Sequence, residues 1–474
     1  ESRNGRAALG SNSVYPARLM KNYDVVVLGG GSAGTAAART AMDEGASVVM
    51  FNDGELGGLC ILRGCMPTKT MLHAAHLVHD AKHSKTPGVK AEGVSIDFKS
   101  VMDNKDVKVA RFKAAKLSGI ESSGYEVVDA RARFTGPDTV EAGGETYKFT
   151  RGAVIATGSV ITIPPIKGIE EVPYLTSDGV MALKIRPASC IVLGTGAIGL
   201  ELGQFMARME CETTVISRRK VFTDVDPRVV EEMEGAMGDE PNLRLIQPMA
   251  PVEVSKTDAG VRVTTADGEH YEAEALIVAT GRKAAHEGLG LEAAGVETER
   301  GVVLCGTDMR TSNPNIFAAG DASGERLLLH VANWEGRVAV LNALEGGSNH
   351  NVEDRLHMGV VFTDPCLATL GLTIAEAKAK GIDAIDASAK WAETGRAITQ
   401  DVAHGVCILV ADKATGEVIG SQILGPRADD LIHQISALMY YHGTVEHMLE
   451  FPWYHPTLSE VFLSLARSIQ SQRS

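Results

Sequence analysis

An α/β fold with two parallel-stranded units is predicted by three features of this 474-residue sequence. Two Gly-x-Gly-x-x-Gly motifs each follow a short apolar, β-branched run, and each opens a helical stretch. Glycine is also abundant, at 50 residues, without the regular period of a fibrous protein. Many tight turns and close backbone approaches to ligands are therefore expected. The length suggests about three domains.

The first glycine motif is residues 29–34, Gly-Gly-Gly-Ser-Ala-Gly. Residues 23–28 before it are typical of a buried parallel strand, and residues 35–44 after it are typical of a helix. A further strand over residues 46–51 completes a βαβ unit. In this context the motif predicts dinucleotide binding, because its glycines let the backbone approach a pyrophosphate at the helix N-terminus. Packing alone is the competing explanation for these glycines.

The residue that would hold the ribose of this dinucleotide is not of the usual type. An acidic residue normally ends the second strand of such a unit. Here that position is Asn52, and Asp53 follows it. Either side chain could hydrogen-bond a ribose hydroxyl, so the expected acid is displaced by one position.

The second motif, residues 194–199, follows a strand over residues 190–193 and precedes another strand over residues 212–216. Two such units in one chain indicate two different dinucleotides. Three further strands end in glycine turns, which are Ala-Thr-Gly at 156–158, Ala-Thr-Gly at 279–281 and Gly-Asp at 320–321. The Asp321 carboxylate at a strand end is well placed to hold a polyol or ribose hydroxyl.

Cys60 and Cys65 are the candidate redox pair, within Leu-Gly-Gly-Leu-Cys-Ile-Leu-Arg-Gly-Cys-Met-Pro-Thr-Lys at residues 56–69. Five residues of ideal helix separate two Cα atoms by ~8.6 Å, whereas a disulfide needs about 4.4–6.8 Å. If the cysteines pair, Cys60 must therefore lie in a loop or a distorted first turn, which Gly57 and Gly58 allow. A helix N-terminus favours the thiolate. Buried unpaired cysteines and a metal site are alternatives that this stretch alone leaves open.

Composition excludes several classes of function. The net charge is −14 without a long basic run, which argues against nucleic acid and anionic membranes as partners. No apolar stretch approaches the ~20 residues of a membrane span. Seven cysteines are too few for a disulfide-stapled secreted scaffold, so a cytoplasmic protein is expected.

Residues 1–21 are interpreted as a leader without structure. They are rich in arginine and serine and contain one acid, Glu1, before Met20. A vector-derived segment and the relic of a transit peptide over residues 1–19 both fit this composition. We favour a natural start near Met20, and an organellar location stays open if the transit peptide is the correct explanation.

A helix is expected over residues 68–82. This helix and the residue after it carry four histidines, which are His73, His76, His79 and His83. Four histidines at helical spacing suggest a metal site, but no carboxylate or cysteine partner is evident. We therefore expect no metal, and we interpret the helix as lining the approach to Cys60.

The order of these motifs resembles that of the flavin-dependent pyridine nucleotide–disulfide oxidoreductases, which include dihydrolipoamide dehydrogenase, glutathione reductase and mercuric reductase. The match is collinear from Tyr23 to Ser468. It rests on six ordered features, which are the first glycine motif, the Cys60-x-x-x-x-Cys65 pair with Pro67 and Lys69, both Ala-Thr-Gly turns, the second glycine motif, Gly320-Asp321, and His455-Pro-Thr-x-x-Glu460. Chance similarity over six ordered motifs is negligible.

The resemblance implies an α/β fold with two Rossmann-like domains, for FAD and NAD(P), and an α+β dimerisation domain at the C-terminus. The FAD domain is implied to be discontinuous, over residues 22–157 and 277–348. The NAD(P) domain would cover residues 158–276 and the dimerisation domain residues 349–474. A homodimer is implied, in which His455 of the partner subunit completes each active site.

Binding residues are implied by the same resemblance. Those for FAD are Gly29, Gly31, Ser32, Ala33, Gly34, Asn52, Gly58, Lys69, Thr157, Gly158, Gly320 and Asp321. Those for the nicotinamide dinucleotide are Gly194, Gly196, Ile198, Gly199, Glu201, Ser217, Arg218, Arg219 and Gly281. Lys69 and Glu201 resemble the ion pair beside the flavin and nicotinamide in relatives. A helix-face lysine and a solvated glutamate are the alternatives.

The implied chemistry passes a nicotinamide hydride to the flavin and two electrons to the Cys60–Cys65 disulfide. By resemblance, Cys65 is the flavin-proximal sulfur and Cys60 the thiol that attacks a small disulfide substrate. His455 is the implied base and acid, because an imidazole titrates near working pH. Glu460 would hold its tautomer through a hydrogen bond. Pro456 suits the first position of a helix and would keep His455 just outside it.

The cysteine loop departs from the family pattern Gly-Gly-Thr-Cys-Val-Asn-x-Gly-Cys. Leu59 replaces the threonine, Ile61 the valine and Leu62 the asparagine, so a flavin-facing hydroxyl and an amide are missing. Arg63 fills the variable position. We expect its cation to lower a thiol pKa or attract an acidic substrate. An arginine that points to solvent is the alternative.

The type of nicotinamide dinucleotide is indicated by the residues after the strand at 212–216. NAD-dependent relatives place an acid there for the ribose 2′-hydroxyl. The residues here are Ser217, Arg218, Arg219 and Lys220. A missing carboxylate and three cations favour a 2′-phosphate, so NADP(H) is favoured over NAD(H). A solvated basic loop is the alternative.

An NADPH-dependent reductase of a small disulfide is the function that best combines these features. The alternative is a dihydrolipoamide dehydrogenase, working in the reverse direction with NAD⁺, which residues 361–365 and 455–460 resemble most. Mercuric reductases end in a vicinal cysteine pair, and this chain has no cysteine after Cys407, so mercury is disfavoured.

A slow redox sensor that keeps the fold is a hypothesis of another class. Leu59, Leu62 and Asn52, the departures from the family pattern, lend it support. The cysteines outside the pair are interpreted as ordinary thiols, and these are Cys190, Cys211, Cys305, Cys366 and Cys407.

Overall fold

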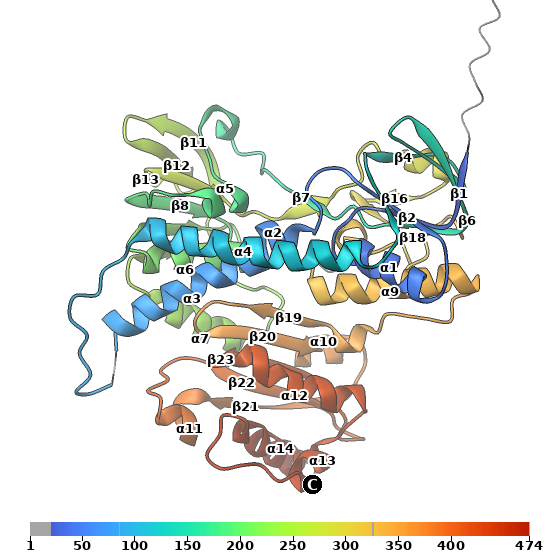
Figure 1. Ribbon diagram of the computed structural model, residues 1–474. Helices are drawn as coiled ribbons and strands as arrows, with labels where there is room; N and C mark the ends of the chain where they lie inside the picture. The colour runs from blue at the N-terminus through green and yellow to red at the C-terminus, as the bar shows by residue number, and fades with distance from the viewer. Residues whose placement is uncertain (1–19, 85, 325–326, 474) are drawn as a thin grey trace, which may run out of the picture.

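The computed structural model describes residues 20–84, 86–324 and 327–473. Two sheets with their helices lie side by side in the upper part of the molecule, and the C-terminal part lies below them (Figure 1). Most of the expected leader, residues 1–19, lies outside the described residues, whereas Lys21 already begins the first strand. Among the described residues, no helix combines the length and the apolar character needed to cross a lipid bilayer.

The first sheet has the strand order β3-β2-β1-β6-β5-β4, and β18 pairs with β6. Its strands are β1 (Lys21–Leu28), β2 (Val48–Asn52), β3 (Glu126–Asp129), β4 (Ala132–Gly136), β5 (Thr139–Ala142), β6 (Glu145–Ile155) and β18 (Ile316–Ala318). The strands β3, β2, β1, β6 and β18 run parallel to their neighbours. The strands β4 and β5 add an antiparallel extension at one edge.

Both faces of β1 are buried, which explains its unbroken apolar run. Val25 and Val27 pack toward α1 (Ser32–Asp43) and α9 (Leu329–Glu345). Val26 and Leu28 point to the opposite face, toward strands β4 to β6. Helix α9 packs directly on α1, so segments that come before and after the second sheet in the sequence share this core.

The second sheet is parallel, with the strand order β10-β9-β8-β14. Its strands are β8 (Ser189–Leu193), β9 (Glu212–Ile216), β10 (Leu243–Ile246) and β14 (Ala275–Val278). The antiparallel strands β11 (Pro251–Thr257), β12 (Gly260–Thr265) and β13 (His270–Ala273) cover one face. The helices nearby are α5 (Ser177–Ala182), α6 (Ala197–Arg208) and α7 (Pro227–Gly238).

Three helices after β2 connect the two upper parts of the molecule. They are α2 (Leu59–Arg63), α3 (Cys65–Lys82) and α4 (Phe98–Glu121). Helix α4 runs from the second sheet to α1 across the upper part of the molecule (Figure 1). Helix α3 packs on α6 through Met71, Leu72 and Ala75.

The C-terminal part is an antiparallel sheet with the order β19-β20-β23-β22-β21, which confirms the expected α+β character. Its strands are β19 (Met358–Val361), β20 (Cys366–Gly371), β21 (Ala384–Lys390), β22 (Val406–Asp412) and β23 (Val418–Gly425). One face packs on α12 (Ala428–Tyr440), α13 (Val445–Glu450) and α14 (Glu460–Arg473). The other face packs on α7.

Short elements complete the fold. β7 (Ser159–Ile161) and β15 (Arg282–Ala284) form an antiparallel pair where the chain enters and leaves the second sheet. The other short strands and helices are β16 (Thr298–Glu299), β17 (Val302–Val303), α8 (Leu291–Ala294), α10 (Ile374–Ala379), α11 (Gly395–Ile398) and the 3-10 turns η1 (Ile169–Glu171), η2 (Gly320–Ala322), η3 (Asp354–Leu356) and η4 (Trp391–Glu393).

The position expected for Pro456 is wrong. The final helix α14 begins only at Glu460, so Pro456 is not in its first turn. The side chain of Glu460 instead accepts a hydrogen bond from the backbone N–H of Thr457, at 2.9 Å. This contact holds the preceding loop without extending the helix through it.

Candidate active site

The glycines of the first motif serve different purposes. Gly29 has a φ of 114°, and a Cβ there would clash with the carbonyl oxygen of Ala156. A Cβ at Gly34 would clash with the carbonyl oxygen of Gly29. Gly31 has an ordinary φ of −80°, and its Cβ would meet only the Cα of Gly58, at 4.0 Å. Packing therefore requires Gly29 and Gly34, whereas the space at Gly31 fits a ligand that approaches the backbone.

The second motif repeats this pattern. Gly194 also has a φ of 114°, and a Cβ there would crowd the carbonyl oxygen of Ala279. A Cβ at Gly199 would clash with the carbonyl oxygen of Gly194. Gly196 has a φ of −71°, and its Cβ would meet nothing within 4 Å. The two motifs are thus equivalent cradles, each with one glycine that packing does not explain.

Polar groups beside the first motif fit a bound dinucleotide. Thr157 Oγ1 is shielded from solvent and has no hydrogen-bond partner among the described residues, and its Cα lies 3.1 Å from a Cβ placed on Gly29. Asp321, after β18, accepts a hydrogen bond from Ser159 Oγ. Arg282 Nε donates to the same hydroxyl at 2.7 Å. Arg282 was not among the predicted site residues, although its position directly after the second Ala-Thr-Gly turn could have indicated it.

Asn52 holds the first motif through its amide. Its Oδ1 accepts the backbone N–H of Gly30 at 3.0 Å, and its Nδ2 donates to the carbonyl oxygen of Gly54 at 2.8 Å. Asp53 is exposed beside it. The amide at this strand end therefore ties two neighbouring loops together.

The candidate redox cysteines lie on two consecutive helices. Cys60 is inside α2, and Cys65 is the first residue of α3. The chain breaks between the two helices at Gly64, where φ is −135° and ψ is −112°. A Cβ at Gly64 would lie 3.1 Å from the Cα of Cys60, so glycine permits this tight break. Both residues are thiols, and they hydrogen-bond each other.

The two thiols have opposite acidities. The Cys60 thiol donates a hydrogen bond to Cys65, and this bond together with the cation of Lys69 lowers the pKa of Cys65 to about 7. The same bond, with burial, raises the pKa of Cys60 above its ordinary value. Cys65 also stands at the N-terminus of α3, whose dipole favours an anion. The two shifts therefore favour the thiolate at Cys65 and the proton at Cys60.

The structure contains the Lys69–Glu201 ion pair that the resemblance implied. Lys69 Nζ lies 2.8 Å and 3.0 Å from the two carboxylate oxygens of Glu201. Glu201 also accepts the backbone N–H of Phe362 at 3.0 Å, and Lys69 lies over the Phe362 ring at 4.4 Å. Glu201 is buried, so the alternative of a solvated glutamate is wrong. Helices α3 and α6 and the loop before β20 thus meet at this pair.

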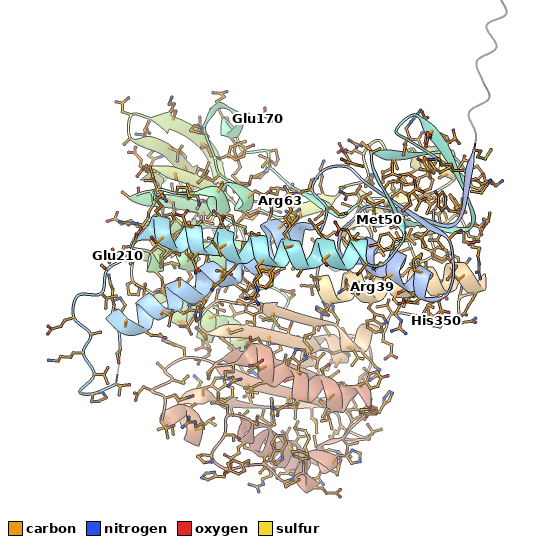
Figure 2. All side chains as sticks on the ribbon, viewed as in Figure 1. Arg39, Met50, Arg63, Glu170, Glu210 and His350 are labelled. Atoms are coloured by element: carbon orange, nitrogen blue, oxygen red, sulfur yellow. The ribbon has the colours of Figure 1, made fainter. Side chains whose placement is uncertain are left out.

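Arg63 is neither the cation of the thiol pair nor an unpaired solvent-facing arginine. It lies at the end of α2 (Figure 2), and its NH1 is 3.0 Å from Asp178 Oδ2 on α5. The cation that lowers the pKa of Cys65 is Lys69. The expectation that Arg63 lowers a thiol pKa is therefore corrected, because its charge is paired across to α5.

Two histidines of α3, His76 and His79, lie against Arg208 of α6 and Glu240 after α7, whereas His73 is exposed. Arg208 donates to His76 Nδ1 at 2.6 Å, and His79 Nδ1 lies 3.1 Å from Glu240. Glu240 is buried and also pairs with Arg208 at 2.8 Å. Across residues 20–84, 86–324 and 327–473, no group of three histidine, cysteine or carboxylate side chains is arranged to hold a metal.

The His455–Glu460 dyad is present but far from the cysteines. His455 Nδ1 lies 2.9 Å from Glu460 Oε1. The N–H of Thr457, followed by the imidazole, lowers the pKa of Glu460. The side chain of His455 is 79% exposed. Helices α13 and α14, which flank this loop, lie at the bottom of the molecule, whereas α2 lies beside α4 in its middle, above the C-terminal sheet (Figure 1).

An aromatic surface surrounds this dyad. Tyr441, Phe451 and Tyr454 are 80%, 60% and 81% exposed. A cavity of about 610 Å³ opens beside them, between α12 and Trp453. Exposed apolar surface of this kind marks a protein–protein contact.

The basic segment after β9 lies beside the second motif. The N–H of Gly194 donates to the carbonyl oxygen of Ile216, the last residue of β9, at 2.9 Å. Ser217 is buried, and Arg218, Arg219 and Lys220 are exposed. None of these cations has an ion-pair partner in the part of the chain that the structure describes. Ile198, at the start of α6, is 39% exposed and leaves an apolar surface nearby.

Known proteins share this arrangement. A family model described as pyridine nucleotide-disulphide oxidoreductase matches residues 23–336, and a model of its dimerisation domain matches residues 358–466. A mercuric reductase of Lysinibacillus sphaericus is 34% identical, over 90% of this chain and 79% of that protein. The mitochondrial dihydrolipoyl dehydrogenase of Dictyostelium discoideum is 34% identical over 93% of each chain. The crystal structure of LpdA from Mycobacterium tuberculosis has a TM-score of 0.85 and 26% identity, and the match covers 95% of this chain and 100% of that one.

Proposed function

Because the chain belongs to the pyridine nucleotide-disulphide oxidoreductase family, and is thus an FAD-dependent oxidoreductase that uses a pyridine nucleotide, we propose that it reduces a small disulfide with NADPH. FAD, when bound, takes a hydride from the nicotinamide and passes two electrons to the Cys60–Cys65 disulfide. The observation that carries the proposal is the placement of Cys65 at the N-terminus of α3, with Cys60 just before it on α2 and the Lys69–Glu201 ion pair one turn further along α3.

The cofactors are assigned to the two cradles. FAD is held by the first motif, with Gly58, Thr157 and Asp321 around it. The nicotinamide dinucleotide is held by the second motif, with Ile198 and the basic segment after β9. Lys69 and Glu201 stand between the thiol pair and the N-terminal end of α6, the helix that the second motif opens.

The difference between the thiols assigns their roles. Cys60 needs a base, which His455 supplies, and the resulting thiolate attacks one sulfur of the substrate. The substrate S–S bond breaks, and the leaving thiolate takes the proton from His455. The Cys65 thiolate then attacks the Cys60 sulfur and re-forms the Cys60–Cys65 disulfide, and the second half of the substrate leaves as a thiolate that takes a proton from solvent. The enzyme dithiol loses two electrons and the substrate disulfide gains them.

His455 of the partner subunit completes each site in this proposal. A dimerisation domain, an exposed aromatic surface and the distance between α2 and α14 within one subunit support it. Subunits with Cys60→Ser and subunits with His455→Ala are each expected to be inactive alone. After random exchange between equal amounts, about one quarter of wild-type activity should return, because half of the dimers have one intact site. No recovery, with exchange shown by mass spectrometry, would place the two residues in one subunit's site.

NADPH is favoured over NADH by the cations after β9. A 2′-phosphate would meet exposed Arg218 and Arg219, for which no carboxylate among the described residues competes. The double variant Arg218→Ala/Arg219→Ala should lower kcat/KM for NADPH by about 100-fold and change that for NADH little. Lys256→Ala, which removes one exposed cation from β11, is the control for a general loss of positive charge. Equal losses with both dinucleotides would refute the assignment.

A dihydrolipoyl dehydrogenase is the second candidate. It is supported by relatives of this activity that match nearly the full length, and by the His455-Pro-Thr segment. A substrate panel of glutathione disulfide, lipoamide and Hg(II) with NADPH, and of dihydrolipoamide with NAD⁺, separates the candidates. Turnover that Cys60→Ser abolishes identifies the substrate, and absence of turnover across the panel would favour a sensor.

A further inference from the structure

Lys116 on α4 is a cation that the mechanism above does not use. Its ammonium donates a hydrogen bond to Thr35 Oγ1 at 2.7 Å, and Thr35 donates to the carbonyl oxygen of Gly31 at 2.8 Å. A Cβ placed on Gly57 would lie 3.7 Å from Lys116 Cγ, so the lysine stem passes beside that glycine. Lys116 therefore contacts both glycine segments that surround the first cradle.

Among the described residues, no carboxylate pairs with the ammonium of Lys116. In contrast, Lys113, one turn earlier on α4, pairs with Glu55 at 2.6 Å. Burial, and then the charge of Arg39, lower the pKa of Lys116. Arg39 lies where α1 meets the end of α4 (Figure 2), and its NH2 donates to the carbonyl oxygen of Gly119 at 3.2 Å.

The position of this cation is unfavourable without an anion. Thr35 is in the first turn of α1, where unpaired backbone N–H groups already carry partial positive charge. A half-buried ammonium at the same place adds to that charge and loses hydration. A strongly anionic group at Gly31 would stabilise the helix terminus and the lysine together.

We propose that Lys116 binds the pyrophosphate of FAD. The ammonium reaches the first motif through Thr35, whose hydroxyl donates to the carbonyl oxygen of Gly31, the glycine that packing leaves open. This inference rests on the proposed placement of FAD at the first motif.

The test measures FAD retention by the holoenzyme. Lys116→Met should release FAD about 10- to 100-fold faster than wild type, followed by the rise of free-flavin fluorescence after dilution. Lys116→Arg should restore most of the retention, because it keeps the cation. Lys113→Met, on the same helix but paired with Glu55, is the matched control and should behave as wild type. Release from wild type should also accelerate with NaCl more steeply than release from Lys116→Met.

The possible failures are distinguishable. Release from Lys116→Met at the rate of the Lys113→Met control would overturn the inference. Faster release that arginine does not rescue and that keeps the wild-type salt dependence would show packing only, and would overturn it too. Gly31→Ala tests the placement of FAD itself, since a Cβ there meets only the Cα of Gly58, at 4.0 Å. Full FAD retention by Gly31→Ala would refute the placement, whereas its loss there with retention in Lys116→Met would refute Lys116 alone.

Discussion

Lys69 and Glu201 should move the pKa of Cys65 in opposite directions, although they are partners in one ion pair. The Lys69 cation lowers the pKa of Cys65, and the Glu201 carboxylate raises it. Lys69→Met should therefore raise this pKa, and Glu201→Gln should lower it. Both substitutions break the same ion pair, so general damage to the site would act alike in the two variants.

The size of the effect follows from the contacts. The hydrogen bond from Cys60 makes the largest contribution to the pKa of Cys65, which is about 7 against an ordinary 9.0, and the charge of Lys69 is shared with Glu201 at 2.8 Å. An opposite charge nearby changes a pKa by about 1–3 pH units, so about one is expected for each substitution here. At neutral pH, Cys65 would be about half thiolate in wild type, about one tenth in Lys69→Met and about nine tenths in Glu201→Gln.

The assay is the rate of alkylation by iodoacetamide against pH. Cys60→Ser is the background, because serine keeps a hydroxyl donor to Cys65 and leaves a single thiol of the pair to titrate. The additional Cys65→Ser variant supplies the blank for the remaining cysteines. Each charge variant is made in this background, and the midpoint of the alkylation profile gives the pKa of Cys65.

Movement of both midpoints in the same direction would refute the electrostatic reasoning. An unchanged midpoint in Lys69→Met would also refute it. Among the described residues, no other lysine pairs with the Glu201 carboxylate near the start of α3. A separate expectation concerns Cys60→Ala, which removes the donor. Its Cys65 should titrate higher than in Cys60→Ser, because the thiolate loses its hydrogen bond.

Two further results are expected. The sequence predicts that Arg63→Ala displaces the pH profile of the reaction between reduced enzyme and disulfide. This displacement should be smaller than that caused by Lys69→Met, because Arg63 is paired with Asp178. Equal displacements would contradict this expectation. Glu240→Gln should lower the free energy of unfolding by about 1.5–3 kcal/mol in denaturant titrations, because buried Arg208 loses one of its two carboxylate partners and keeps only Asp364. Although burial raises the pKa of Glu240, hydrogen bonds from His79 and Arg208 lower it to about 2, so its contribution is complete above its ordinary 4.5 and is lost as the pH falls toward 2. Wild type should lose stability over that range more steeply than Glu240→Gln, and equal slopes would count against the pair.

Local patterns in the chain were enough to predict both cradles. The apolar run of β1 and the glycines after it depend on neighbours within a few residues, and covalent spacing alone brings Gly29 and Gly34 together. The same holds for His455 and Glu460, which are joined by a short loop. Pro456 was misjudged because the side chain of Glu460, rather than the helix, satisfies the backbone of that loop.

Contacts between distant segments could not be predicted in this way. The sequence shows that Arg63 is near the cysteines, but only packing sets it against Asp178 on α5. It shows histidines on α3, but not that Arg208 and Glu240 contact two of them. Lys116 carries no motif at all, and its meaning appears only where α4 crosses α1.

Sequence alone determined the chemical inventory of this protein and its order along the chain: two cradles, a cysteine pair, a distant imidazole and a basic segment. These follow from residue type and short-range spacing, which the covalent chain dictates. Tertiary structure decided which charge acts on which thiol, because Coulomb interactions depend on distance and burial rather than on order. It also placed α13 and α14, the helices that flank the dyad, away from α2 in one subunit (Figure 1), which supports the proposal that the dyad serves the cysteines of a second copy.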